Sequence, residues 1–427
     1  MNILIVGGGF IGGRLAHAFL AAGHQVTVAG RNGEKIRRAI PGVHVVTLDF
    51  TKGDGIAWRG CLQGMEVVIN TVGVIGDQAS NRMMAVHTTG PMALFQACYE
   101  MKIPQVIQIS ALGADPAGAT CYYRTKGKAD AFLAELDPQG KIMRWSVVRP
   151  SLVVGRGGGS HGLFAGMASF PLMPRLGKGE WRVQPVHVND LTAMIVDLVD
   201  HRESAPAWLE AVGPSPMTTD ELTLALRRWL GLSGGIFIPV PIFMLRLSGW
   251  LGDRLPLGPM NSESLVMLMG DNLATAGHTH GTPPKPLPVA LGLEPATQGD
   301  VWEARFSLLR LPLRWALGLF WMVSGLLPLL VTETNRMGYE LLARMGATGW
   351  WADFLLYGAS MLDILLGGLL LLGVRARLVG GIQIGVTMIF SLLILWFLPE
   401  FLLHPFAPLT KNIPLMAALA MMMVLEK

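Results

Sequence analysis

The sequence predicts an α/β Rossmann domain, a doubly wound parallel sheet, followed by an all-α four-helix transmembrane bundle. Strand-like apolar runs alternate with helical patterns over residues 1–150, and long uncharged runs follow Arg314. Of 427 residues, 51% are hydrophobic and 15% are charged, whereas soluble domains carry about 25% charged residues. This composition disfavours a plain cytosolic enzyme, a disordered regulator and a disulfide scaffold.

The first run, Asn2–Val6, has no basic segment before it and breaks at Gly7, so we interpret it as a buried strand and not a signal peptide. We therefore expect the first domain to stay cytoplasmic. Near-continuous apolar strands separated by helices are typical of a parallel sheet. The expected strands are Asn2–Val6, Gln25–Ala29, His44–Leu48, Val67–Asn70, Gln105–Ser110 and Trp145–Arg149, and the expected helices between them include Gly12–Ala22, Ala85–Met101 and Thr125–Leu136.

Residues 151–300 are less regular than the part before them. Helical patterns are present near Thr218–Leu230 and Met244–Leu251. A Pro/Gly-rich stretch, Gly281–Pro288, is predicted to be part of a linker.

A glycine motif, G-x-G-x-x-G, follows the first strand and opens the first helix. Gly7 permits a tight turn, Gly9 lets the backbone approach a pyrophosphate, and Gly12 lets the helix pack closely on the strand. The anion would bind at the helix N-terminus, where Phe10 and Ile11 stand. The motif at this place predicts dinucleotide binding.

The end of the second strand indicates which cofactor is preferred. NAD sites usually carry an acid there for the ribose hydroxyls, but this chain has Arg31 and no acid before Glu34. Arg31 is placed to meet a 2′-phosphate, which favours NADP(H) over NAD(H), although a solvated surface arginine is the alternative. Asp49, after the third strand, is either an adenine contact or an ordinary acidic loop residue.

Three residues form a candidate catalytic set. Ser110 closes the fifth strand, and Tyr122 and Lys126 form Y-x-x-x-K on the helix that follows. Positions i and i+4 share a helix face, so a lysine ammonium could lower the pKa of the tyrosine and let the phenol act as general acid or base. Ser110 could hold a substrate carbonyl oxygen. A surface helix is the alternative interpretation.

Residues 1–300 resemble the atypical and extended short-chain dehydrogenase/reductases, in particular the NAD(P)-binding proteins related to an accessory subunit of respiratory complex I. The matching segments are VGGGFIGGRL at the first turn, INTVG at 69–73, ISALGADP at 109–116, YYRTK at 122–126, VVRPSLVVG at 147–155 and QPVHVNDL at 184–191. The resemblance implies a Rossmann core with a small substrate lobe over residues 1–300. It also implies that Ser110, Tyr122 and Lys126 are the Ser-Tyr-Lys set, that Thr71, Val72 and Gly73 line the cofactor, and that Arg149-Pro150-Ser151 flank its nicotinamide end.

Residues 301–427 are predicted to be the membrane domain. A bilayer core needs about 20 apolar residues per helix, and the spans are expected at about 313–332, 354–374, 378–399 and 407–425. A buried helical core is the alternative, disfavoured because so many such runs occur close together.

The charges that flank these spans predict the orientation. With the first domain inside, Arg305, Arg310, Arg314, Arg375 and Arg377 would be cytoplasmic, against Arg336, Arg344 and Lys411 outside. This bias agrees with the positive-inside rule. We expect a multi-pass protein of a bacterial-type inner membrane, with the N-terminal domain and the C-terminus cytoplasmic.

The segments Leu355–Asp363 and Pro405–Pro414 resemble the DoxX-like four-helix membrane family over residues 306–427. Asp363 lies in mid-span. An acid there is costly and usually faces the bundle interior or a water-filled cavity. It is either a functional polar contact or a hydrogen-bonded acid that packs helices.

Together these patterns predict a membrane-anchored NAD(P)(H)-dependent oxidoreductase acting on a lipophilic carbonyl or hydroxyl substrate, with quinones among the candidates. The alternative is a non-catalytic NAD(P)H-binding protein that assembles a membrane complex or senses redox state. Membrane lipid and a membrane-complex partner are therefore expected. Nucleic acid is not, because no Lys/Arg run is present. Cys61, Cys98 and Cys121 have no metal-site spacing, so no metal is expected.

Overall fold

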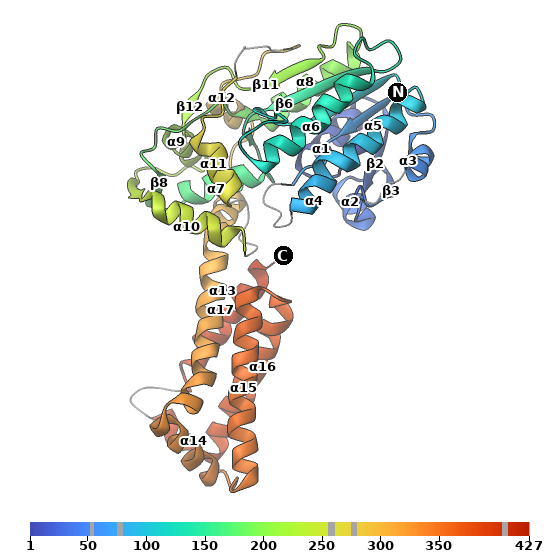
Figure 1. Ribbon diagram of the computed structural model, residues 1–427. Helices are drawn as coiled ribbons and strands as arrows, with labels where there is room; N and C mark the ends of the chain where they lie inside the picture. The colour runs from blue at the N-terminus through green and yellow to red at the C-terminus, as the bar shows by residue number, and fades with distance from the viewer. Residues whose placement is uncertain (52–54, 75–79, 255–260, 275–279, 404–408, 427) are drawn as a thin grey trace. The chain divides into compact units, whose positions relative to one another are not determined.

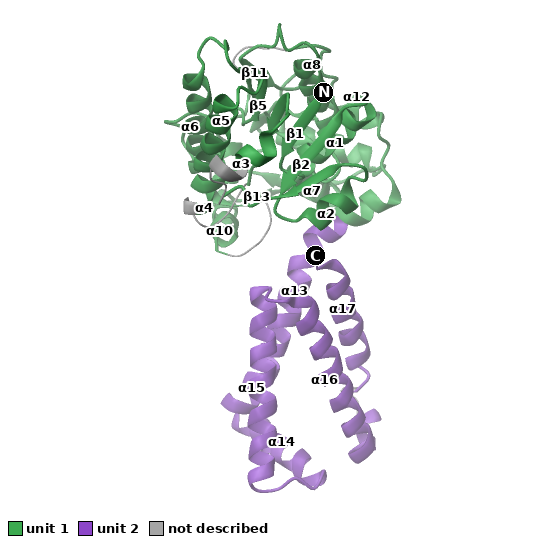
Figure 2. Cartoon of the chain, turned by 90° about the vertical axis from the view of Figure 1, so that its right-hand side faces the viewer, with its two compact units in different colours: residues 1–304 green, residues 305–427 purple. Residues whose placement is uncertain are grey.

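The computed structural model describes the chain except residues 52–54, 75–79, 255–260, 275–279, 404–408 and 427. It divides into two compact units, Met1–Ala304 and Arg305–Lys427 (Figure 2). Each unit is described by itself below.

Unit 1 is built on a parallel seven-stranded sheet in the order β3-β2-β1-β4-β5-β6-β11 (Figure 1). The strands are β1 Asn2–Val6, β2 Gln25–Gly30, β3 His44–Thr47, β4 Val67–Asn70, β5 Gln105–Ile109, β6 Arg144–Pro150 and β11 Trp208–Ala211. The predicted Rossmann fold is thus confirmed, and β11 is a strand that we did not predict. Val6 pairs with both Ala29 and Asn70, so the ends of β1, β2 and β4 meet at the point where the strand order reverses.

Helices cover both faces of this sheet, because side chains alternate along each strand. Ile3 and Ile5 of β1 belong to one buried cluster, with Leu15 of α1 (Phe10–Ala21) and Leu191 of α8 (Val188–Asp200). Leu4 and Val6 belong to the other, with residues of α3 (Gly55–Leu62), α5 (Gly90–Glu100) and α6 (Cys121–Leu136). The helix pattern expected at Ala85–Met101 contains a short π-helix, η1 (Ala85–Thr89), before α5.

The remaining elements of unit 1 are short. They are α2 Gly33–Ala39, α4 Ser80–Met84, β7 Val153–Val154, α7 Gly159–Ala168, β8 Leu172–Leu176, β9 Arg182–Val183, β10 Val186–His187, β12 Met217–Thr218, α9 Thr219–Trp229, β13 Ile236–Val240, α10 Ile242–Gly252, α11 Ser262–Met269 and α12 Leu287–Gly292. The prediction of a linker at Gly281–Pro288 is wrong, because Lys285 donates from its backbone N–H and its ammonium to Asp190 of α8. That ion pair holds the stretch on unit 1.

Unit 2 is helical, as expected. It contains α13 Gln298–Leu330 (which begins in unit 1), α14 Thr332–Arg344, α15 Trp350–Leu372, α16 Ala376–Phe397, the 3-10 turn η2 Pro399–Leu402 and α17 Asn412–Leu425. In the described residues, α13, α15 and α16 are long and apolar enough to cross a membrane, while α17 is shorter. Helix α14 was not expected, and part of the fourth predicted span lies outside the described residues.

Two contacts define one end of unit 2. Arg314 of α13 forms an ion pair of 3.2 Å with Glu426, which follows α17. Arg377, near the start of α16, donates to the Met423 carbonyl at 3.2 Å. Arg314, one of the predicted flanking cations, is only 4% exposed. Two arginines of the predicted cytoplasmic flanks therefore lie at the same end as the end of α17.

Candidate functional site

The three glycines of the motif, Gly7, Gly9 and Gly12, differ in what a side chain would meet at each position. Gly7 has a φ of 103°, in the region that L side chains avoid. A Cβ on Gly12 would lie 1.8 Å from the Gly7 carbonyl oxygen. A Cβ on Gly9, in contrast, would meet nothing within 4 Å. No described protein group explains a glycine at position 9, so the open space beside it suits a bound ligand.

The side chain of Thr71 is hydrogen-bonded to the backbone of the glycine loop between β1 and α1. Its hydroxyl lies 3.0 Å from the Val6 carbonyl oxygen and 2.8 Å from that of Gly7. Thr71 was expected to line a cofactor, but its side chain is occupied by the loop backbone. It therefore shapes the site.

Phe10 and Ile11 open helix α1, which has no side-chain cap on its first N–H groups. The Ile11 side chain packs on the buried cluster of α1 and α8. The Phe10 ring lies against the Gly155–Gly158 segment, where a Cβ on Gly158 would be 3.0 Å from the ring. Both side chains thus face protein, and what remains for an anion is the helix N-terminus itself.

The two residues proposed for the adenosine end differ in their surroundings. Arg31 is exposed directly after β2 and makes no side-chain hydrogen bond or ion pair with the part of the chain that the structure describes. Asp49 is engaged locally, since its carboxylate accepts from the N–H and the hydroxyl of Thr51 at 3.1 and 2.8 Å. The Arg31 side chain is therefore available for a ligand phosphate, whereas the Asp49 carboxylate is already held by Thr51.

Lys126 lies buried beneath the ends of β4 and β5. Its ammonium donates to the Ile109 carbonyl at 2.8 Å and to the Val72 carbonyl at 3.3 Å, and it lies 3.4 Å from where a Cβ on Gly73 would stand. Burial lowers the pKa of Lys126 to about 8, partly opposed by the Asp130 carboxylate. Since an ammonium has three donors, one remains for a ligand.

Tyr122 lies in the first turn of α6, which begins four residues earlier than Thr125, where we expected it. Thr120 and Glu263 of α11 satisfy the free N–H groups of this turn, Glu263 accepting from Cys121 and Tyr122 at 3.1 and 2.8 Å. Burial, together with Tyr123 and Asp130, raises the pKa of Tyr122 above its ordinary value. We expected the pKa of Tyr122 to be lowered, and this expectation is not met. Because the pKa is raised, the phenol keeps its proton at neutral pH.

Ser110 does not reach Tyr122 by a hydrogen bond within the described chain. Its hydroxyl donates to Asp130 at 2.6 Å, and Arg149 binds the same carboxylate oxygen at 3.1 Å. The other oxygen of Asp130 is buried without a described partner. Burial raises the pKa of Asp130 to about 6, against the hydrogen bond from Ser110 and the positive charges of Arg149 and Lys126.

His87 of η1 is a site residue that the sequence pattern did not single out. Its Nε2 accepts from the Val74 N–H at 3.0 Å, so the proton of the neutral ring is on Nδ1, which faces the Thr125 hydroxyl at 3.2 Å. Its ring meets the Tyr122 ring edge-on at 5.2 Å. Burial and Lys126 lower the pKa of His87 to about 2, so the ring that packs against Tyr122 is neutral.

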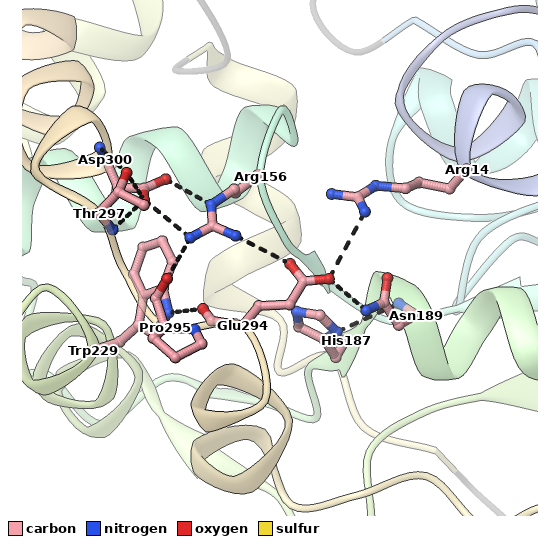
Figure 3. A network of polar contacts seen from close by, with 9 residues as sticks. All are labelled: Arg14, Arg156, His187, Asn189, Trp229, Glu294, Pro295, Thr297 and Asp300. Atoms are coloured by element: carbon pink, nitrogen blue, oxygen red, sulfur yellow. Dashed lines mark hydrogen bonds and ion pairs between the residues drawn. The ribbon is translucent and has the colours of Figure 1, made fainter. Parts of the chain in front are cut away.

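A second polar network joins the glycine-loop helix to the segment before α13 (Figure 3). Arg156 donates to both carboxylate oxygens of Asp300, at 2.8 and 3.0 Å, and pairs with Glu294 at 3.5 Å. Glu294 also accepts from Asn189 at 2.6 Å and lies 3.8 Å from Arg14 of α1. The network therefore links helix α1, which follows the glycine loop, to the first turn of α13.

In unit 2, Asp363 of α15 is half-buried beside α13, its Cβ lying 3.0 Å from where a Cβ on Gly325 would stand. Its Oδ1 has no hydrogen-bond partner among the described residues. Gln383 of α16 is fully buried, and both polar atoms of its amide are likewise without described partners.

Comparisons with known proteins give a family match in each of the two parts of the chain. Residues 3–208 match the NAD dependent epimerase/dehydratase family, and residues 318–420 match the DoxX-like family. The chain therefore joins a part that is similar to the first family to a part that is similar to the second. The epimerase/dehydratase match includes the glycine loop, Ser110, Tyr122 and Lys126, and the DoxX-like match includes Asp363.

Three relatives match part of the chain. The mitochondrial NADH dehydrogenase [ubiquinone] 1 alpha subcomplex subunit 9 of Arabidopsis thaliana is 29% identical, over 50% of this chain and 54% of that protein. Its counterpart from Mus musculus is 25% identical over the same shares. The chloroplastic epimerase family protein SDR39U1 homolog of Arabidopsis thaliana is 24% identical, over 58% of this chain and 75% of that protein. The chain thus spans about half the length of the two NADH dehydrogenase subunits.

Among solved structures, the UDP-glucuronic acid 4-epimerase of Bacillus cereus in complex with NAD is 18% identical with a TM-score of 0.49. The UDP-glucose 4-epimerase of Thermus thermophilus in complex with NAD is also 18% identical, with a TM-score of 0.48. Each match covers 56% of this chain and 86% of the other.

Proposed function

We propose that this chain is a membrane-anchored NAD(P)(H)-dependent oxidoreductase that acts on a lipophilic carbonyl or hydroxyl compound. The observation that carries the proposal is the environment of Lys126. Its buried ammonium is held by two strand-end carbonyls, has one donor left, and stands one helical turn after Tyr122. A purely structural lysine would be an expensive way to fill this position, because burying an ammonium costs free energy.

The residues present fit a dinucleotide. The open space at Gly9 and the uncapped start of α1 would receive the pyrophosphate. The third donor of Lys126 would bind a ribose hydroxyl. Arg31, without a described partner, would bind a 2′-phosphate, which favours NADP(H) over NAD(H). A bound nicotinamide would supply the hydride acceptor or donor.

The protonation states favour one direction of reaction. Tyr122 holds its proton at neutral pH, since its pKa is raised by burial. A protonated phenol is the general acid that a substrate carbonyl oxygen needs when the carbonyl is reduced. Neutral His87 packs against the Tyr122 ring and fixes its orientation. We therefore propose reduction of a carbonyl, with Tyr122 as the proton donor.

The membrane unit is proposed to keep this site close to substrates that leave the bilayer, with quinones among the candidates. We propose an inner membrane and a cytoplasmic unit 1. Arg314 and Arg377 lie at the end of unit 2 where α17 finishes, which supports the positive-inside orientation with a cytoplasmic C-terminus.

A second function has its own support. Two relatives are subunits of NADH dehydrogenase by name, and the Ser110 hydroxyl is bound to Asp130 instead of facing Tyr122. These observations favour a non-catalytic role, in which unit 1 binds NAD(P)H while the chain assembles a membrane complex or senses redox state. The partner would then be that complex.

One experiment separates the two proposals. NADPH and NADH are titrated against the detergent-purified full chain, and nicotinamide fluorescence is followed with quinones and lipid aldehydes as oxidants. The enzyme proposal requires Tyr122→Phe to abolish turnover at unchanged cofactor affinity. Tyr123→Phe is the matched control, because that neighbouring hydroxyl instead accepts from Asn272 at 3.2 Å.

The outcomes are distinct. Turnover that is lost only in Tyr122→Phe supports the oxidoreductase. Tight binding without turnover across the oxidants favours the assembly or sensing protein. If neither NADPH nor NADH binds, both proposals are contradicted.

A further inference from the structure

Helix α10 of unit 1 is apolar on two opposite faces. Its inner face is formed by Leu245, Gly249 and Gly252, which are buried and spaced by four and three residues. A Cβ on Gly249 would lie 3.2 Å from the backbone nitrogen of Ser262, so the helix lies directly on the start of α11. This face accounts for its attachment to the lobe.

The outer face is also apolar. Phe243, Leu247 and Trp250 are 66%, 53% and 48% exposed. Their spacing of four and three residues places them in one stripe, opposite the buried face. A helix on the surface of a soluble domain normally turns polar side chains to that side. The large side chains of α10 therefore face outward without any described protein group covering them.

The strand before α10 continues this character. Ile236 and Ile238 of β13 are 67% and 45% exposed, and they lie on one face of the strand because side chains alternate. Leu172 of β8 pairs with Ile236 and is 56% exposed. Pro241 alone separates β13 from α10. One continuous segment, Ile236–Trp250, thus presents apolar side chains to its surroundings.

The charged side chains that this segment exposes most are arginines. Helix α10 contains Arg246 and no carboxylate. Arg254, just beyond it, lies with its guanidinium 3.8 Å above the Trp250 ring. The carboxylate of Asp253 is turned inward and accepts from the Ser262 N–H at 3.0 Å. Exposed Phe, Leu and Trp beside arginine are the combination by which helices lie in the headgroup region of anionic bilayers.

We propose that the segment Ile236–Arg254 docks on the surface of an anionic lipid bilayer. A bilayer is the expected partner of this surface, because the DoxX-like unit of the same chain carries helices long enough to cross one. Two arginines match phosphate headgroups, and the apolar stripe matches the acyl boundary beneath them. Docking does not require unit 1 to be an enzyme, so this inference stands apart from the proposed function.

The docked segment would lie one helix away from the candidate catalytic residue. Helix α10 packs on α11, and Glu263 of α11 accepts the N–H groups of Cys121 and Tyr122. A lipophilic substrate leaving the bilayer at α10 would therefore emerge next to α11, whose Glu263 caps the helix that carries Tyr122.

The test uses the full chain in nanodiscs of phosphatidylcholine with about one third phosphatidylglycerol. A nitroxide is attached through Leu247→Cys, and its collisions with lipid-soluble oxygen and a water-soluble nickel chelate are measured by electron paramagnetic resonance. Lys141→Cys, at an exposed polar position of unit 1, is the matched control. The signal of the labelled unsubstituted chain, which has three free cysteines, is subtracted.

At position 247 we expect the nitroxide to collide more often with oxygen than with the nickel chelate. At position 141 we expect the reverse. Arg246→Gln with Arg254→Gln should weaken docking by about fivefold per arginine and move the position-247 label toward nickel. Equal nickel access at both positions would show a solvent-exposed face and overturn the proposal. Protection of position 247 from both reagents would also overturn it, because the face would then be covered by protein, either unit 2, a second copy or a partner.

Discussion

The Ser110 hydroxyl donates a 2.6 Å hydrogen bond to the Asp130 carboxylate, and Arg149 binds the same oxygen. The proton of the serine is therefore committed while Asp130 is ionised. In that state Ser110 can accept a hydrogen bond from a substrate, but it cannot donate one to a carbonyl oxygen. The acid, placed one helical turn after Lys126, decides what the serine can do.

Asp130 should make carbonyl reduction pH-dependent. Burial raises its pKa to about 6, so the carboxylate is ionised above that pH and protonated below it. We expect kcat for reduction to rise several-fold as the pH falls through about 6, because the Ser110 hydroxyl is then released. Asp130→Asn should remove the rise, since an amide does not titrate. A wild-type profile without an inflection near that pH would contradict the role given to the acid.

Lys126 should give opposite pH dependences for cofactor binding and stability. Its pKa is lowered from 10.5 to about 8, so the ammonium that would bind ribose is lost above pH 8. The NADPH Kd should rise by up to about tenfold per pH unit there. Over the range from 8 to 10.5 the unfolded chain binds more protons than the folded one, so the cofactor-free protein should gain stability.

Fluorescence titration and thermal unfolding across that range measure the two effects. Lys126→Met should abolish both dependences. The Asp130 carboxylate raises the pKa of Lys126. In Asp130→Asn the pH above which NADPH binding weakens should therefore be lower. Weakening of binding at the same pH in Lys126→Met would assign it to another group.

The parts of the site that follow from a local sequence pattern could be predicted. The parts that depend on contacts between distant residues could not. The six strands and the glycine loop follow from apolar runs and from the steric needs of Gly7 and Gly12. His87 was missed because its partners, Val74 and Thr125, are brought to it only by the fold. The raised pKa of Tyr122 was missed for the same reason, since burial is not visible in Y-x-x-x-K.

Long-range contacts also explain the errors outside the site. The turn of α6 that carries Tyr122 depends on Glu263, a residue far along the chain that caps it. The Pro/Gly-rich stretch was interpreted as a linker, but Lys285 binds Asp190 and holds it on α8. In unit 2 the uncharged runs predicted the helices, whereas nothing in the pattern indicated that Arg314 would be buried against Glu426.

Gly9 and Gly12 should respond differently to a side chain. A Cβ on Gly9 meets open space, and its φ of −86° suits any L residue. Gly9→Val should therefore leave the melting temperature nearly unchanged while NADPH affinity is lost. Gly12→Ala places a Cβ 1.8 Å from the Gly7 carbonyl oxygen, so the loop must move and stability should fall. Calorimetry and nucleotide titration on both variants check this, and undiminished affinity in Gly9→Val would remove the pyrophosphate from this loop.

Removing one partner of the Arg314–Glu426 pair should lower the free energy of unfolding strongly, whereas replacing both partners by apolar residues should lower it little. Both residues are nearly buried and their charged atoms are 3.2 Å apart. Removing one partner leaves an unpaired buried charge, which typically costs about 3–5 kcal/mol. We expect Arg314→Met or Glu426→Met alone to lower the unfolding midpoint of the detergent-solubilised chain markedly.

The double replacement Arg314→Met with Glu426→Met should recover most of that loss, because apolar residues of similar size can stand in for a buried pair. Arg344 and Glu400 form an exposed pair at 2.8 Å and serve as the control, since exposed pairs contribute about 0–1 kcal/mol. A thermodynamic cycle from the midpoints isolates the coupling between the partners. If the two single losses simply add in the double variant, Arg314 and Glu426 do not stabilise each other, and the contact between the start of the membrane unit and its C-terminal end has another cause.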